Sequence, residues 1–118
     1  MPVDTPLRVR RADLRNARDA ARYIALLDAY ARDPMGAAEP LSTGVLERLP
    51  NDLSTHPGTF CLLAEHADEA VGFATCFIGY STFQARPLLN IHDIAVLAEW
   101  RGRGVARRLM DTIVRWAS

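Results

Sequence analysis

Hydrophobic and polar residues follow two different periods in the first third of the chain. Leu7 and Val9 alternate with arginines, which predicts a short strand with one solvated face. From Leu14 to Leu27 the apolar residues recur every three or four positions, which predicts an amphipathic helix with Asp13 as its cap. We expect this helix to end just before Pro34, because proline disfavours helical geometry in the residue that precedes it.

The other face of that helix is charged, and Arg15 and Asp19 have the i,i+4 spacing of an ion pair. A second, short helix is expected next, capped by Ser42 or Thr43. It should end where Pro50 interrupts it, with a separate turn after it.

Three strands are predicted in the middle of the chain, over Thr59–Glu65, Ala70–Ser81 and Leu88–Leu97, the first two joined by a hairpin loop over residues 66–69. The second strand is apolar on both faces, which is typical of a central strand covered on both sides. Alternation places Val71, Phe73 and Phe77 on one face and Ala74, Cys76 and Ile78 on the other.

A last amphipathic helix is predicted from Gly104 to the end of the sequence. Its apolar stripe consists of Val105, Leu109, Ile113 and Trp116. The resulting order is β-α-α-β-β-β-α, which predicts an α+β or α/β fold with a mixed sheet. The 118 residues are enough for a single domain with its own core, so we treat 1–118 as one domain.

Composition narrows the function classes. Fourteen basic and fourteen acidic residues give no net charge, so neither nucleic acid nor a membrane surface is expected as a partner. All the basic residues are arginines, a bias associated with GC-rich bacterial genomes. Cys61 and Cys76 lie in apolar runs, and His56, His66 and His92 lack ligand spacing, so no metal site is expected. Buried thiols and the lack of an apolar leader predict a cytoplasmic protein.

The segment with the clearest chemistry is a strand followed by a glycine-containing turn and then a helix. Backbone N–H groups at such a turn and the helix N-terminus form a site for a phosphate or pyrophosphate, and the alternative is a purely structural turn. It lacks the Gly-Lys-Ser/Thr of a Walker loop. The residues are Arg101, Gly102, Arg103, Gly104, Val105, Ala106 and Arg107.

Arg101 to Ala106 resembles the Arg/Gln-x-x-Gly-x-Gly/Ala signature of the GCN5-related N-acetyltransferases (GNAT), and the upstream elements resemble the N-terminal half of that fold. The resemblance implies acetyl-CoA as donor and direct transfer to a primary amine of a small molecule or peptide. It also implies that backbone groups of Ile94, Ala95 and Val96 hold the pantetheine arm, and that the amides from Arg101 to Arg107 hold the pyrophosphate.

Candidate catalytic residues lie earlier on the same strand. Alternation places Asn90 and His92 on one face and Ile91 and Asp93 on the other. Family members often carry a Glu or His near these positions, so the resemblance makes His92 the first candidate for the general base, with Asp93 second and Asn90 beside them. The alternatives are that His92 and Asp93 only fix the strand and that ordered water takes the proton.

Five further residues lie on elements that wall the acceptor site in the family. They are Tyr30, Met35, Glu39, Tyr80 and Phe83. The resemblance gives them a role beside the acceptor amine, whereas aromatic residues at such positions more often belong to the core.

In the family a fifth strand, which pairs with the coenzyme-binding strand, and a further helix with a tyrosine follow the last helix. We expect this chain to be short of them, which leaves Leu88–Leu97 as an apolar edge and favours a homodimer. The alternative to an enzyme is a non-catalytic CoA-binding or protein-interaction module. RNA binding through Arg101 to Gly104 is disfavoured by the absence of an arginine-glycine repeat.

Overall fold

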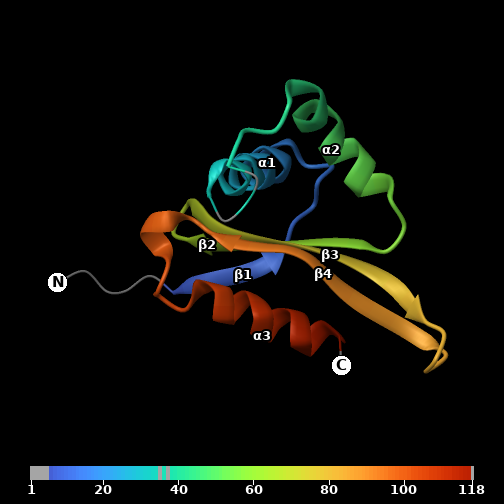
Figure 1. The fold of residues 1–118 in the computed structure, drawn as a ribbon. Helices are drawn as coiled ribbons and strands as arrows, with labels where there is room; N and C mark the ends of the chain where they lie inside the picture. Colours follow the sequence, from blue (N-terminus) through green and yellow to red (C-terminus); the bar gives the residue numbers. More distant parts are fainter. Residues whose placement is uncertain (1–5, 35, 37, 118) are drawn as a thin grey trace.

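The computed structural model describes residues 6–34, 36 and 38–117 of the chain. The α+β fold and the predicted order of its elements are confirmed (Figure 1). The elements are β1 (Leu7–Arg11), α1 (Ala17–Arg32), α2 (Thr43–Thr55), β2 (Thr59–His66), β3 (Glu69–Ser81), β4 (Arg86–Val96), a 3-10 turn η1 (Ala98–Trp100) and α3 (Val105–Ala117).

The strands form one sheet in the order β1-β2-β3-β4. Each neighbouring pair is antiparallel, so the sheet in the described part of the chain is antiparallel and not mixed. The reason is local: tight turns join β2 to β3 and β3 to β4, and only antiparallel strands can be joined in this way. Helices α1 and α2 lie on one face of the sheet and α3 lies on the other, while the β3–β4 hairpin extends beyond the helices (Figure 1).

The sheet separates two apolar clusters, as its two-faced central strand predicts. On the α3 face, Leu62, Ala74 and Cys76 pack against Leu109 and other residues of the helix. On the α1 face, Cys61, Leu63 and Phe73 pack against Tyr23 and Leu26. Burial of both thiols is therefore confirmed, and both cysteines are free.

The start of α1 differs from the prediction. Asn16, and not Asp13, caps the helix, because its side chain accepts the N–H of Asp19. Asp19 does not pair with Arg15 on a solvated face. It is buried and pairs with Arg10 of β1 at 2.6 Å, while Arg15 pairs with Asp13. The hydrogen bonds from Arg10 outweigh burial and lower the pKa of Asp19 to about 2.

Arg10 also donates to Glu65 of β2, with 2.7 Å between Nε and Oε1, and Arg8 and Arg22 pair with the same carboxylate. Burial alone would raise the pKa of Glu65, but its arginine partners outweigh that effect and hold the pKa below its usual value. This network joins β1, β2 and α1.

Helix α2 is continuous through Pro50, contrary to the predicted break. Ser42 caps it, as expected, by accepting the N–H of Val45. Pro50 removes only one helical hydrogen bond, and α2 has no buried residue, so water can reach the freed carbonyl. Beyond the proline, the carbonyl of Asn51 accepts the hydroxyls of Ser54 and Thr55.

A β-bulge in β3 changes one predicted side-chain face. Ala64 pairs with Gly72 and Glu65 pairs with Ala70, so Val71 is an extra residue in β3. Val71 therefore packs in the cluster on the α3 face, although alternation predicted it on the face of Phe73. A bulge of this kind shifts the alternation by one residue and leaves no signal in the hydrophobic pattern.

Candidate functional site

A second β-bulge lies in β4, at the position of the first candidate base. Thr75 of β3 pairs with Asp93 and Cys76 pairs with Ile91, so His92 is the extra residue. Residues directly opposite each other share a face of the sheet. Because the Thr75 hydroxyl contacts Tyr23 of α1, Asp93 lies on the α1 face and not, as predicted, with Ile91.

The bulge gathers all three candidate catalytic residues on one face. Asn90 lies opposite Phe77, and the His92 ring contacts the Phe77 ring with 5.6 Å between centroids. Phe77 in turn contacts His56 at the end of α2. His92 and Asn90 are exposed and Asp93 is half-buried, so the imidazole is accessible beside a partly desolvated carboxylate.

The strand beyond the bulge has backbone groups that point away from β3. Leu97 N–H donates to the Val71 carbonyl at 2.9 Å, so the Val96 carbonyl in the same trans peptide points away from β3. Backbone direction alternates along an antiparallel strand, so Ile94 and Val96 present their N–H and C=O groups to the open edge, and Ala95 faces β3. An extended amide chain can pair with these groups as another strand would.

A glycine turn follows η1 and leads into α3. Gly102 and Gly104 have φ angles of +78° and +84°, and a Cβ at either position would meet no atom within 4 Å. Glycine is required here for the left-handed backbone and not for lack of space. Arg108 N–H donates to the Gly104 carbonyl, so the amides before Arg108 have no partner within the helix. Unpaired amides at a helix N-terminus suit an anion.

The arginines of this turn do not all remain available. Arg101 donates from Nε to the Val96 carbonyl at 3.2 Å and pairs with Asp33 at 2.8 Å. The Arg103 guanidinium lies over the Trp100 ring, 4.7 Å from its centroid. Arg107 is exposed on the first turn of α3, next to exposed Ala106. Positive charge therefore surrounds the uncapped amides, while the guanidinium of Arg101 covers part of the open edge.

A small cavity of about 200 Å³ adjoins that edge on the α1 face. Tyr30 of α1 and Asp33, the residue just after α1, form one wall, and residues 95–99 form the other. The Tyr30 ring also packs against Phe73. Both interpretations of Tyr30 therefore hold in part, because it packs against the core and also lines a cavity beside β4.

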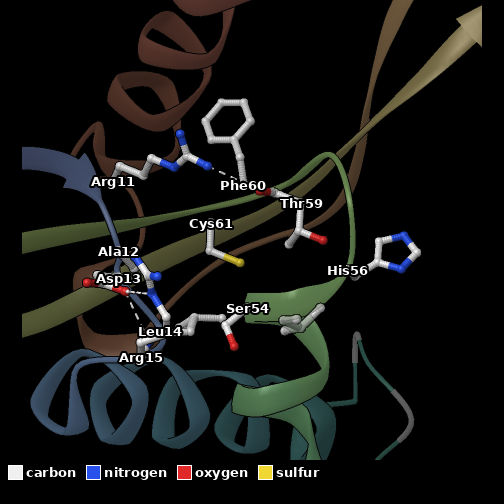
Figure 2. Close-up of a pocket in the computed structure, with 11 residues that line it drawn as sticks. Arg11, Ala12, Asp13, Leu14, Arg15, Ser54, His56, Thr59, Phe60 and Cys61 are labelled. Carbon is white, nitrogen blue, oxygen red and sulfur yellow. Dashed lines mark hydrogen bonds and ion pairs between the residues drawn. The ribbon is translucent and has the colours of Figure 1, made fainter.

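A larger cavity, of about 520 Å³, lies between β2, the segment that joins β1 to α1 and the end of α2 (Figure 2). Cys61 lies on its sheet side, with Ser54 and His56 on the side of α2 (Figure 2). Burial raises the pKa of the Cys61 thiol to about 11, which keeps it protonated and unreactive at neutral pH. No β4 residue lines this cavity, so it is separate from the candidate site.

Of the other predicted wall residues, the three that the structure describes do not meet at the site. Tyr80 and Phe83 lie on the protruding β3–β4 hairpin with exposed side chains. Glu39 is exposed in the loop after α1, where its N–H donates to the Ala31 carbonyl. Met35 lies outside the described residues.

Sequence reasoning missed three residues that the structure brings to the site. Tyr23 and Thr75 form a buried hydroxyl pair beneath Asp93, and Asp33 binds Arg101. The sequence pattern marks Asp33 only as the residue before Pro34, where the helix is expected to end. The hydroxyl pair joins positions 52 residues apart, so no local pattern could have found it.

The described residues contain neither a metal-binding cluster nor a membrane-spanning helix. No group of three or more His, Cys, Asp or Glu side chains is placed to hold a metal ion. Within the same part of the chain, every helix is too short or too polar to cross a bilayer.

Comparison with known proteins connects this geometry to a family. The model of the acetyltransferase (GNAT) family matches residues 20–118, most of the chain. A curated relative, an uncharacterized N-acetyltransferase of Archaeoglobus fulgidus, is 37% identical over 57 residues. That match covers 48% of this chain and only 39% of the relative.

Solved structures share the fold at lower identity. One is a ribosomal-protein-alanine N-acetyltransferase from Brucella melitensis biovar Abortus 2308. The match covers 95% of this chain and 72% of that chain, with a TM-score of 0.74 and 21% sequence identity. Another is an aminoglycoside acetyltransferase from an uncultured soil metagenomic sample, in complex with sisomicin. The match covers 93% of this chain and 68% of that chain, with a TM-score of 0.75 and 20% sequence identity. A third is AAC(6')-Iy, bound to a CoA-containing bisubstrate analogue. The match covers 95% of this chain and 71% of that chain, with a TM-score of 0.74 and 19% sequence identity.

Proposed function

The chain belongs to the GNAT acetyltransferase family, and from this premise we propose that it transfers an acetyl group from acetyl-CoA to a primary amine of a small molecule or peptide. One observation carries the proposal. The open backbone edge at Ile94 and Val96 leads directly, through η1, to the uncapped amides at the start of α3. A molecule that carries both an extended amide arm and a diphosphate needs a strand edge for the arm and, next to it, amide donors for the diphosphate.

The residues fit acetyl-CoA at both ends of this path. Ile94 and Val96 would hold the pantetheine amides, and the amides of residues 104–107 would hold the pyrophosphate. Gly102 and Gly104 allow close approach of the backbone, and Arg103 and Arg107 supply positive charge. Arg101 would join them once it leaves the Val96 carbonyl. Bound acetyl-CoA supplies an activated thioester as the acyl donor.

The remaining task is to remove a proton from the acceptor. A primary amine is protonated at neutral pH and becomes a nucleophile only as the free base. His92 is exposed on the β4 bulge, and imidazole accepts a proton in this pH range. We assign His92 as the base, with Asp93 and Asn90 on the same face. As the C–N bond forms and the C–S bond breaks, the amine proton would pass to His92, directly or through a water molecule, and CoA would leave as a thiolate that takes a proton from solvent.

The proposal is tested in two steps with the purified protein. Isothermal titration with CoA measures coenzyme binding, and thiol release from acetyl-CoA measures transfer to a panel of amines. The panel contains sisomicin and a peptide with an N-terminal alanine, because the names of two structural neighbours point to such acceptors. Binding with amine-dependent thiol release supports the proposal. Binding without release on any amine overturns it in favour of the non-catalytic CoA-binding module.

The compartment follows from the thiols and not from the fold. Cys61 and Cys76 are both free and buried, as expected in a reducing environment. We propose a cytoplasmic location, which fractionation of cells that express the protein would check.

A further inference from the structure

Three aromatic rings form a row on the α1 face of the sheet, and the proposed base is one of them. The Phe77 ring of β3 contacts the His92 ring edge-on, with 5.6 Å between centroids, and contacts the His56 ring edge-on, with 5.4 Å between centroids. Both contacts have the geometry that aromatic pairs prefer. Phe77 is only half-buried and both imidazoles are exposed, so a ligand at His92 can also reach the Phe77 ring.

Gly79 leaves open space beside this row. It lies two residues after Phe77 on β3 and opposite exposed Leu88 of β4, so all three residues face the same side of the sheet. Among the described residues, a Cβ on Gly79 would come within 4 Å only of Asn90 Nδ2, at 3.3 Å, and of the Leu88 carbonyl oxygen. The φ angle of Gly79 is not positive, so the backbone does not require glycine here. Phe77, Gly79 and Leu88 thus form an apolar shelf with a flat centre.

The charges around the apolar shelf suit a single ammonium group. Residues 71–92 contain no Asp or Glu, and their one permanently charged residue is Arg86. Asp93 is the carboxylate that β4 places on this face, next to the proposed base. On α2, Asp52 lies one helical turn before His56, but it is exposed, and solvent and salt screen its charge. A second ammonium group on the acceptor would therefore lie against an apolar surface without a counter-charge, which is unfavourable.

We propose that the acceptor is an aromatic monoamine, whose ammonium group lies at His92 and Asp93 and whose ring packs on the apolar shelf against Phe77. The inference rests on the proposed function and narrows its substrate class, while the bonds that form and break stay the same. A flat ring fits over Gly79, buries apolar surface there and adds an aromatic contact with Phe77. An acceptor without a ring would leave the apolar shelf exposed, and a polycation would lack partners for its other charges.

The first test measures kcat/KM for thiol release from acetyl-CoA with three amines. Phenylethylamine has one amine and a ring, ethylamine has the amine without the ring, and sisomicin has several amines. We expect phenylethylamine to exceed both others by at least about ten-fold, since a single methylene group in an apolar pocket already changes kcat/KM by about that much. Equal values for phenylethylamine and ethylamine, or a preference for sisomicin, would overturn this inference and leave the proposed function standing. Absence of thiol release with every amine would overturn both.

The second test fills the apolar shelf. Gly79→Leu should lower kcat/KM for phenylethylamine by at least about ten-fold and leave ethylamine turnover and CoA affinity within about two-fold of wild type. Gly44→Leu is the matched control, because it adds the same side chain on α2 where no atom lies within 4 Å, and it should change neither amine. Should Gly79→Leu fail to fold, Phe77→Leu decides through the ratio of the two kcat/KM values, because misplacement of His92 would slow both amines alike. A folded variant with the wild-type ratio would overturn the inference.

Discussion

Arg101 and Asp33 form an ion pair of 2.8 Å that joins the glycine turn to the end of α1. The same arginine donates from Nε to the Val96 carbonyl, on the open edge of β4. Asp33 thus helps to hold the Arg101 side chain over the edge that the pantetheine arm would occupy. Coenzyme binding should therefore compete with this ion pair.

Asp33→Asn should tighten CoA binding. Loss of the charge removes the ion pair that holds Arg101 over the edge of β4. Because a partly exposed ion pair contributes about 0.2–1 kcal/mol, we expect the affinity for CoA to rise by up to about five-fold. Isothermal titration with CoA measures it. Asp52→Asn removes the same charge from exposed α2 and should leave the affinity unchanged. Weaker binding by Asp33→Asn would show that the pair supports the bound state instead.

Gly104→Asp should reduce CoA affinity by more than ten-fold. A carboxylate at the start of α3 would repel the pyrophosphate from the uncapped amides. The matched control is Gly104→Asn, which has the same shape and accepts the same φ of +84° without the charge. The asparagine variant should retain most of the affinity in the same titration. If both variants bind CoA equally well, the anion site is not at this turn.

His92→Ala should lower kcat by about 10²–10⁴-fold, the usual contribution of a general base, with less change in CoA affinity. The loss should shrink as the pH rises, because the free amine then needs no base. The measurement is kcat for thiol release across a pH series with CoA affinity determined in parallel. A variant with wild-type turnover at every pH would leave His92 with a structural role only.

Acid should destabilise the fold through the buried network around Asp19. The folded pKa of Asp19 is about 2, below its ordinary value of 3.8, so the carboxylate stabilises the native state at pH values above its unfolded pKa. About 2 kcal/mol of the unfolding free energy should be lost as the pH falls from about 5 to 2. Urea denaturation at several pH values measures the loss. The Asp19→Asn variant should be less stable at pH 7 and less sensitive to acid in this range.

The 118-residue chain should self-associate through the open edge of β4. Leu88 and Ile91 are exposed beside unpaired backbone groups, and Trp116 of α3 is 48% exposed. Pairing of the β4 strands of two copies would cover the edge of β4 and the exposed face of α3 with Trp116. Sedimentation equilibrium should show a dimer, and Leu88→Lys with Ile91→Lys should shift it to monomer. A folded wild-type monomer near 13.1 kDa would contradict this expectation.

The elements were predictable because their hydrophobic periods are regular, as for Val105, Leu109 and Ile113, which are all buried on α3. The glycine turn was predictable because glycine readily adopts the positive φ angles that Gly102 and Gly104 have. The faces of Val71 and Asp93 were not, since each depends on a bulge that is set by pairing with another strand. The same holds for Asp19, whose partner Arg10 lies on β1 and not on its own helix.

The bulge at His92 also determines where β4 can change its length. Removal of one residue from a paired strand normally turns every later side chain to the opposite face. Deletion of His92 would instead leave Ile91 opposite Cys76 and Asp93 opposite Thr75 in a regular ladder. The strand would thus lose its first candidate base while keeping its register. On the proposed assignment of His92 as the base, catalysis and folding are separable at this one position, so a relative without the extra residue could retain the fold as an inactive binding protein.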